Sequence, residues 1–399
     1  MKRREFLLQG AAGVAAAGLA VPTLRASSAG KKPGGKIVYR TLGRTGLKIP
    51  VLSFGVMNTD SPDLIKKALD LGLNHLDTAN GYMRGNSEAS IGRVLKETGM
   101  RDKVVVSTKI WLSRDWNTGA FTAEDSGRAP GANADNFNRM LGESLERLQS
   151  SYVDILYVHA CDNAGMVTFE NTMNAAVKAK EAGKARFIGV STHTRVPEVI
   201  RAAVDAKVYD VVEAAFNFQR DDRDEVAKAV EYARENGVGI VAMKTQGGAR
   251  REGDPAAFPH KAALKWVLQH EGVTTTIPGM STFEQLDLNF SVMADLALTD
   301  EEKKAVQMSS LHHGGFCQNC GECVAQCPSR VAVPDLMRAY SYAEGYGNFS
   351  HAEWTLGNLP ADRGLSACGS CSECKVDCRH GVNVAGRVQK LGRQFRQYA

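Results

Sequence analysis

Short apolar runs alternate with amphipathic stretches along most of the chain after Lys36. The runs are rich in Val and Ile and are continuous, as is typical of strands that are buried on both faces of a parallel sheet. They occupy residues 51–55, 74–79, 103–109, 152–159, 185–192, 210–217, 239–244 and 274–279. The pattern therefore predicts eight buried parallel strands.

The stretches between these runs have helical periodicity. Residues 133–149 (NADNFNRMLGESLERLQ) open with an Asn/Asp cap signal and repeat Leu at helical spacing. A further helix is expected at 298–311. Strand–helix units over about 250 residues are typical of an α/β fold of the (β/α)8 TIM-barrel type. A doubly wound open sheet is the alternative, but no G-x-G-x-x-G turn follows the first strand.

The first thirty residues have the layout of a signal peptide. Arg3 and Arg4 precede Phe6 and an Ala/Gly-rich apolar run that ends at Val21. Twin arginines followed at a fixed distance by Phe and Leu favour export through the Tat pathway over the Sec pathway. The apolar run is short and weakly hydrophobic, so we expect no stable transmembrane span, with an uncleaved anchor as the alternative. The prediction is export to the periplasm or another extracytoplasmic space.

Composition limits the kinds of partner and of cysteine chemistry that the chain can have. The net charge of +5 is too small to indicate a nucleic-acid partner. Of nine cysteines, eight fall in two runs and only Cys161 stands alone. A secreted disulfide framework would spread its cysteines through a short chain, so the two runs indicate metal ligands. For Cys161 we expect a buried free thiol, with a redox or substrate contact as the alternative.

The first run, CQNCGECVAQCP, has the spacing C-x2-C-x2-C-x3-C-P of bacterial ferredoxins, in which the fourth cysteine binds the other cluster. The second run, CGSCSECKVDC, repeats it with Arg379 in place of the proline. Two [4Fe-4S] clusters are predicted, one on Cys317, Cys320, Cys323 and Cys378, the other on Cys327, Cys368, Cys371 and Cys374. Zinc is the competing interpretation, although zinc sites usually separate two C-x2-C pairs widely.

Polar residues at the carboxyl ends of the predicted strands are the candidates for chemistry, because barrel enzymes place their active sites there. Asp77 ends the second strand, with Tyr82 close behind, Lys109 ends the third and His159 ends the fourth. One such residue is usually structural. Asp, Tyr, Lys and His on three consecutive strand ends indicate an active site.

The segments LGRTGLKIPVLSFG, LDTANGYMRGNSEASIGRVL, VVVSTK, DILYVH and IGVST resemble the signature segments of the aldo/keto reductase family over residues 38–311. The resemblance implies that Asp77, Tyr82, Lys109 and His159 fall on the four catalytic positions of that family. The tail resembles the ferredoxin-type extension of one branch. We therefore predict a signal peptide in 1–30, a reductase barrel in 36–311 and a small helical two-cluster domain in 312–399.

In carbonyl reduction these four residues would have separate tasks. Tyr82 would donate the proton, and the ammonium of Lys109 would lower the pKa of Tyr82, which is about 10 in isolation. Asp77 would hold Lys109 in place, and His159 would orient the substrate oxygen. A retired active site is the alternative.

The resemblance also implies a nicotinamide dinucleotide, NAD(P), with altered contacts. Glu213 stands where the family has an amide-binding Gln, Met243 where a Tyr stacks on the ring, and Gln285 where an Arg clamps the 2′-phosphate. The remaining implied contacts are Ser191, Thr192, Lys244 and Asn289. Loss of a bidentate arginine should weaken any preference for NADP.

The resulting prediction is an exported iron–sulfur oxidoreductase that acts on a small-molecule carbonyl or alcohol. Clusters move single electrons whereas nicotinamide moves a hydride. The clusters would therefore feed an unusual cofactor, exchange electrons with a redox partner protein, or serve only the structure of the tail. The alternative function is an electron-transfer protein whose barrel is a docking scaffold.

Overall fold

The computed structural model describes residues 36–399 apart from 117, 127, 248–257, 312–314, 316, 370 and 372. The predicted signal peptide, residues 1–30, lies outside the described residues. None of the described helices combines the length and apolar character that a membrane crossing requires.

Eight parallel strands form one sheet in which neighbours in space are also neighbours in the chain. They are β3 (Phe54–Gly55), β4 (His75–Asp77), β5 (Val105–Ile110), β6 (Val153–Val158), β7 (Ala185–Thr192), β8 (Val211–Ala215), β9 (Gly239–Met243) and β10 (Val273–Thr276). Parallel bridges Leu52–Thr276 and Gly55–Gly279 join the two edges. The sheet therefore closes on itself, which confirms the predicted (β/α)8 fold.

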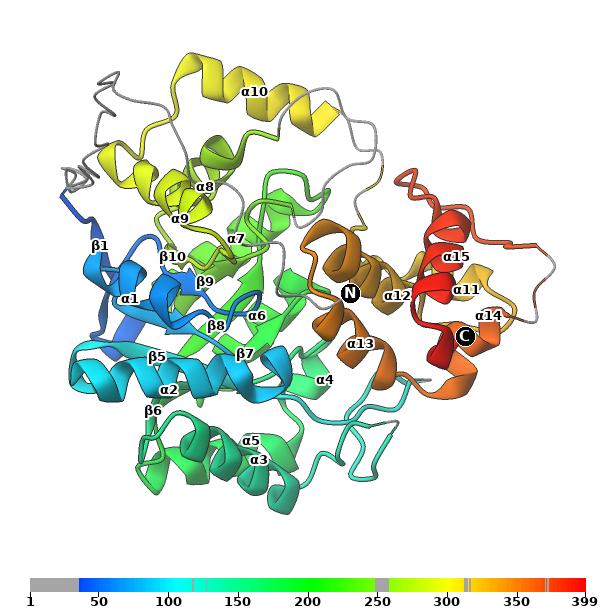
Figure 1. The fold of residues 1–399 in the computed structure, drawn as a ribbon, viewed down its shortest axis with the longest axis horizontal. Coiled ribbons are helices and arrows are strands. Elements are labelled where there is room, and N and C mark those ends of the chain that lie inside the picture. The colour runs from blue at the N-terminus through cyan, green and yellow to red at the C-terminus, as the bar shows by residue number, and fades with distance from the viewer. Residues whose placement is uncertain are drawn as a thin grey trace, which may run out of the picture. The chain divides into compact units, whose positions relative to one another are not determined.

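Helices alternate with the strands and cover the outside of the sheet (Figure 1). They are α1 (Pro62–Asp70), α2 (Asn86–Thr98), α3 (Ala134–Arg147), α4 (Ala164–Val167), α5 (Glu170–Glu181), α6 (Val196–Asp205), α7 (Arg223–Glu235), α8 (His260–Leu268), α9 (Phe283–Phe290) and α10 (Asp300–Leu311). The predicted Asn cap is present, because the Asn133 side chain accepts from the Asn136 N–H over 2.9 Å. Helix α10 confirms the helix expected at 298–311.

A hairpin of β1 (Tyr39–Thr41) and β2 (Lys48–Pro50) precedes the barrel and was not predicted. Its strands are three residues long, too short to show an alternating pattern.

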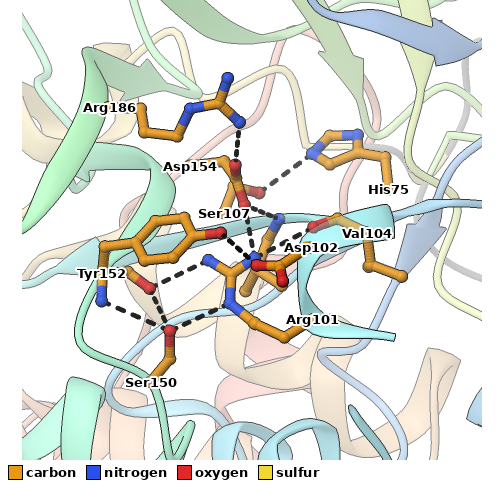
Figure 2. A network of polar contacts seen from close by, with 10 residues as sticks. His75, Arg101, Asp102, Val104, Ser107, Ser150, Tyr152, Asp154 and Arg186 are labelled. Carbon is orange, nitrogen blue, oxygen red and sulfur yellow. Dashed lines mark hydrogen bonds and ion pairs between the residues drawn. The ribbon is translucent and has the colours of Figure 1, made fainter. Parts of the chain in front are cut away.

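A polar network lies near the amino ends of β5, β6 and β7 (Figure 2). The buried Asp154 carboxylate binds Arg101 at 2.9 Å and Arg186 at 2.6 Å, and accepts from the Val106 N–H at 2.9 Å. Arg101 also donates to the Tyr152 carbonyl at 2.9 Å. The network joins three successive strands at the end opposite to the candidate chemistry.

The C-terminal region is helical and has a hydrophobic cluster of its own around Val331, Leu336, Ala352 and Leu391. Its elements are α11 (Glu322–Gln326), α12 (Val333–Tyr340), η5 (Ser341–Gly345), α13 (Phe349–Gly357), η6 (Ala361–Arg363), α14 (Leu365–Cys368), α15 (Val384–Gln394) and η7 (Arg396–Tyr398). It contacts the barrel directly, since the Asn348 side chain donates to the Met57 carbonyl over 3.1 Å and Glu353 pairs with Arg84.

Candidate active site

The four predicted catalytic residues lie at the carboxyl ends of neighbouring strands. Asp77 is the last residue of β4, Lys109 lies near the end of β5 and His159 follows β6 directly. Tyr82 opens the 3-10 helix η2 (Tyr82–Gly85). All four side chains are buried. The structure brings them together, and their catalytic roles stay predictions.

Lys109 is the centre of a buried charge cluster. Its ammonium forms an ion pair with Asp77, lies 3.2 Å from Glu213 Oε2 and donates to the Thr78 carbonyl over 2.9 Å. The side chains of Lys109, Asp77 and Glu213 are only 0%, 3% and 2% exposed. An unpaired charge at this depth would cost several kcal/mol, so the two carboxylates offset the desolvation of the ammonium and fix its position.

A chain of buried hydrogen bonds inside the barrel supports Asp77 from below. Ser107 donates to Asp77 Oδ2 over 2.6 Å, and its hydroxyl lies 3.2 Å from His75 Nε2. Because Ser107 has one proton, it accepts from His75 Nε2, and His75 Nδ1 accepts in turn from Ser53 at 3.0 Å. Burial lowers the pKa of His75 to about 4, which agrees with a neutral ring. The chain holds the Asp77 carboxylate in one orientation.

Glu213 lies in β8 at the wall of the cavity described below. The resemblance implied a contact between this residue and the nicotinamide amide, whereas the described contact is with Lys109. Burial and the nearby Asp77 raise the pKa of Glu213, and Lys109 opposes them. Glu213 is therefore a second carboxylate of the Lys109 cluster, a role that sequence reasoning missed.

The protonation of Tyr82 is set by opposing effects. Burial raises the pKa of Tyr82 above its usual range, and the positive charge of Lys109 acts in the lowering direction. The expected lowering by Lys109 is thus outweighed by desolvation, and Tyr82 is a neutral phenol. Burial lowers the pKa of Lys109, but Asp77 and Glu213 raise it more, so its net shift is upward and the ammonium remains charged.

His159 stands beside the phenol, with its ring centroid 5.9 Å from that of Tyr82 in an edge arrangement. Burial and the charge of Lys109 hold the pKa of His159 well below its usual range. The imidazole is therefore neutral and carries one ring N–H that can donate to a substrate oxygen. The Trp111 ring contacts His159 from another side, at 5.5 Å between centroids.

The C-terminal region forms part of the same site. The His351 ring lies 5.3 Å from Tyr82 and stacks on Trp354 at 5.1 Å. Trp354 meets Trp111 edge-on at 5.3 Å. A Cβ on Gly81 would come 2.9 Å from the Trp354 ring, so the residue before Tyr82 leaves room for this contact. These tail residues are about 270 positions from Tyr82, and no local signal in the sequence could have placed them here.

These residues line a cavity of about 530 Å³, within the size range of small-molecule sites. Its barrel side includes Tyr82, Trp111, His159, His193, Glu213 and Lys244. Its tail side includes Asp335, Arg338, Tyr342, Tyr346, His351 and Trp354. Both the reacting groups and the C-terminal helices therefore face one space.

Only some of the residues predicted to contact the dinucleotide line the cavity. Met243, Lys244 and Asn289 line the cavity, as does Gln285. The Asn289 carbonyl oxygen accepts from Gln246 over 2.9 Å, and the Gln285 oxygen accepts from the Ser281 N–H over 2.8 Å. Gln285 is therefore held by its own loop, and it carries no positive charge for a phosphate.

Ser191 and Thr192, at the end of β7, are not in the cavity lining. The Ser191 hydroxyl accepts from the Ala160 N–H over 2.9 Å, and the Thr192 hydroxyl donates to the Thr194 carbonyl over 2.7 Å. Both side chains are fully buried and serve the backbone. Their predicted contact with the dinucleotide stays a prediction. Cys161 is a fully buried free thiol whose pKa is raised by burial.

The cysteines gather in the two predicted sets. Cys317, Cys320 and Cys323 line one hollow together with Cys378 from the second run. Burial and the neighbouring thiols of Cys327, Cys371 and Cys374 raise the pKa of Cys368, which places Cys327 with the second run. The structure thus brings one cysteine of each run to the other. Their binding of iron stays a prediction.

Family comparisons match both parts of the chain. Residues 53–258 and 256–310 match the model of the aldo/keto reductase family. Residues 316–388 match the model of the 4Fe-4S dicluster domain. The second match indicates an iron–sulfur domain at the C-terminal end.

Individual proteins agree with the first match. L-glyceraldehyde 3-phosphate reductase of Escherichia coli O157:H7 is 26% identical over 326 residues, which cover 67% of this chain and 91% of that protein. L-galactose dehydrogenase of Arabidopsis thaliana is 28% identical over 302 residues, covering 65% and 89%. The holo form of an aldo-keto reductase from Bacillus halodurans superposes with a TM-score of 0.55 at 22% identity, covering 68% of this chain and 96% of that one, which supports the fold.

Proposed function

Because the chain belongs to the aldo/keto reductase family, we propose that this oxidoreductase reduces the carbonyl group of a small molecule, or oxidises the corresponding alcohol, with Tyr82 as the proton donor. The observation that carries the proposal is the buried cluster of Asp77, Lys109 and Glu213 beneath Tyr82, beside a neutral His159. The L-glyceraldehyde 3-phosphate reductase and L-galactose dehydrogenase relatives act, by their names, on this class of compound.

Proton transfer follows from the geometry. The Lys109 ammonium lies 5.3 Å from the centroid of the Tyr82 ring, close enough to stabilise negative charge on the phenol oxygen when its proton leaves. The neutral His159 ring donates a hydrogen bond to the substrate oxygen and turns it toward Tyr82. Trp111, His351 and Trp354 form an aromatic wall on one side of this space.

A nicotinamide dinucleotide fits the barrel side of the cavity. Met243 and Asn289 would hold it, and when bound it would supply a hydride. Gln285 offers no charge to a 2′-phosphate and its side chain is already engaged. We therefore propose weak discrimination between NADH and NADPH, which titration of each cofactor tests; thousandfold tighter binding of NADPH would contradict it.

The two sets of four cysteines fit two [4Fe-4S] clusters, which pass single electrons when bound. Cys371 and Cys374 are exposed, which suits exchange with a redox partner protein. Anaerobically purified protein should contain close to eight irons and eight sulfides per chain. Stoichiometric zinc in a colourless protein would refute this part of the proposal.

We also propose export through the Tat pathway, from the Arg3-Arg4 motif. Replacement of both arginines by lysine should trap an unprocessed precursor in the cytoplasm, as fractionation would show. Unchanged export would refute a Tat signal.

The test of the activity is turnover of aldehydes with NADH, NADPH or a reduced viologen as reductant. Tyr82→Phe should abolish it, whereas Tyr232→Phe, which removes a hydroxyl that donates to Asp205 on the outside of the barrel, should not. Equal turnover by wild type and Tyr82→Phe would contradict the assigned proton donor. Reduction of a protein carrier without any carbonyl turnover would favour the electron-transfer alternative.

A further inference from the structure

The cavity carries hydrogen-bonding atoms that no protein group satisfies. His193 Nδ1, His351 Nδ1, Trp111 Nε1 and Arg338 Nε are buried and have no hydrogen-bond partner in the part of the chain that the structure describes. All four residues line the cavity. The indole and guanidinium nitrogens can only donate, and each imidazole nitrogen donates in one tautomer. Buried donors without partners are costly, so they indicate a ligand rich in acceptors.

Two cations face the same space. The Lys244 ammonium lies 4.9 Å from the Tyr342 ring centroid and 5.2 Å from that of Tyr346. Across the described residues it forms no ion pair with a carboxylate. Arg338 pairs with Asp335 at 3.2 Å through Nη1, and its Nε has no hydrogen-bond partner among the described residues. Lys244 therefore has aromatic faces but no counter-ion.

The carboxylates of the cavity are already engaged. Asp77 and Glu213 share Lys109, and Asp335 is bound by Arg338. The unpartnered atoms of the cavity are therefore mostly donors, although Glu213 Oε2, which lies 3.2 Å from the Lys109 ammonium, and the Thr245 hydroxyl also lack a hydrogen bond. A ligand that completes the site must bring negative charge and acceptor oxygens, for which the guanidinium fork is the matching partner.

We propose that the cavity recognises an anionic carbonyl compound, whose carboxylate or phosphate is bound between Arg338 and Lys244 with His193 beside them. This inference rests on the proposed function only in taking the bound anion to be a carbonyl compound. The electrostatics agree with it: burial and the charge of Arg338 together lower the pKa of Lys244 to about 7, and a bound anion would restore the charge.

The site joins the two parts of the chain. Arg338 belongs to α12 in the C-terminal region, whereas Lys244 follows β9 and His193 follows β7 of the barrel. Met337, the residue before Arg338 in α12, lines the hollow that contains Cys317, Cys320 and Cys323. A bound anion would therefore tie the tail to the barrel at the point where the tail carries its first cysteine set.

The test is equilibrium binding, which needs no turnover. Calorimetry of the iron-loaded protein should show that benzoate binds more tightly than benzamide, its neutral isostere. Arg338→Gln should reduce this preference about tenfold to hundredfold, the usual weight of a charge-assisted hydrogen bond. Arg393→Gln removes an exposed charge from α15 and should leave the preference unchanged.

Because Arg338→Gln strands the Asp335 carboxylate, a second variant combines it with Asp335→Asn, so that no charge is left buried alone. Iron content and the visible spectrum report that the tail is intact. The double variant should show the same loss of preference. A benzoate preference that survives in both variants and disappears in His159→Gln would overturn the proposal, because the anion would then lie on the catalytic residues.

Two further arms identify the anion and separate this inference from the proposed function. Competition by inorganic phosphate, weakened in Arg338→Gln, supports a phosphate-bearing substrate; its absence supports a carboxylate. Unchanged NADPH affinity in Arg338→Gln supports a substrate anion, whereas a parallel loss would overturn it in favour of a dinucleotide phosphate. Failure of Tyr82→Phe to affect turnover contradicts the catalytic assignment and leaves these binding results unaffected.

Discussion

Two buried charge clusters occupy opposite ends of the same barrel. Near the amino ends, Asp154 is bound by Arg101 and Arg186, whose side chains are 18% and 50% exposed. At the carboxyl ends, Lys109 is fully buried between Asp77 and Glu213, and these two carboxylates line the cavity. The arginines of the first cluster are partly exposed, and the cluster bonds to backbone groups of neighbouring strands. It can therefore only hold those strands together. The second is enclosed beside a reacting group, where its charge acts on whatever enters.

The comparison agrees with the division of labour in barrels, where the amino-end face serves stability and the carboxyl-end face serves chemistry. Here the two ends are also linked differently to the rest of the chain. The Asp154 network draws on Arg101, shortly before β5, and on Arg186 of β7, both next to it in the barrel (Figure 2). The Lys109 end is instead covered by the C-terminal region through His351 and Trp354.

The largest expected effect is at the carboxyl end. Lys109→Met removes the ammonium that stabilises charge on Tyr82, so kcat should fall about a hundredfold to ten-thousandfold, the usual weight of assisted proton transfer. Steady-state kinetics with an aldehyde measures it. Retained kcat with a lowered melting temperature would show that Lys109 is only a structural ion pair.

At the amino end the same kind of change should affect stability. Arg101→Met removes the bonds to Asp154, Ser150 and the Tyr152 carbonyl and leaves the buried carboxylate with Arg186. The free energy of unfolding should fall by about 3 kcal/mol, measured by denaturant titration, with kcat within twofold of wild type. A large loss of kcat without destabilisation would contradict a purely structural role for Arg101.

The smallest expected effect concerns pH. Burial lowers the pKa of Lys244 to about 7, so its charge is lost as pH rises through 7. Benzoate affinity should therefore decline above pH 7, by up to about tenfold per unit while the complex stays protonated.

The other titratable groups near Lys244 differ in whether their charge changes near pH 7. Burial lowers the pKa of His193 and of His351, and it raises the pKa of Tyr342 and of Tyr346, so none of these four changes charge near pH 7. Arg338, whose pKa is raised, stays charged. Glu213 has a raised pKa and could mimic the decline. Lys244→Met should therefore remove the pH dependence, and its persistence would assign it to Glu213.

The sequence predicts the barrel well because each strand is a local Val/Ile-rich run, and buried parallel strands need little else. Asp77, Lys109 and His159 were predictable because strand ends are predictable and barrel chemistry collects there. The cysteine sets were predictable because one loop must wrap one cluster. Each of these inferences starts from a local pattern in the sequence, although each predicted cysteine set takes its fourth member from the other run.

The site residues that were not predicted are brought together by contacts between segments that are distant in the sequence. Nothing near His351, Trp354 or Arg338 in the chain indicates that they face Tyr82, because only the packing of α12 and α13 on the barrel brings them there. Glu213 was interpreted by analogy with an amide-binding residue, and its pairing with Lys109 depends on which strands are opposite each other in the closed sheet. The direction of the Tyr82 shift depends on burial, which the sequence does not report.

The most direct test is a matched pair of substitutions, Asp77→Asn and Asp154→Asn, with kcat and the free energy of unfolding measured for both. Each removes one buried carboxylate from the same sheet. Asp77→Asn should lower kcat at least a hundredfold with little loss of stability, because Glu213 still balances Lys109. Asp154→Asn should lower stability by about 3 kcal/mol and leave kcat nearly unchanged. The account would be contradicted if both variants lost the same quantity, or if Asp77→Asn turned over substrate as fast as wild type.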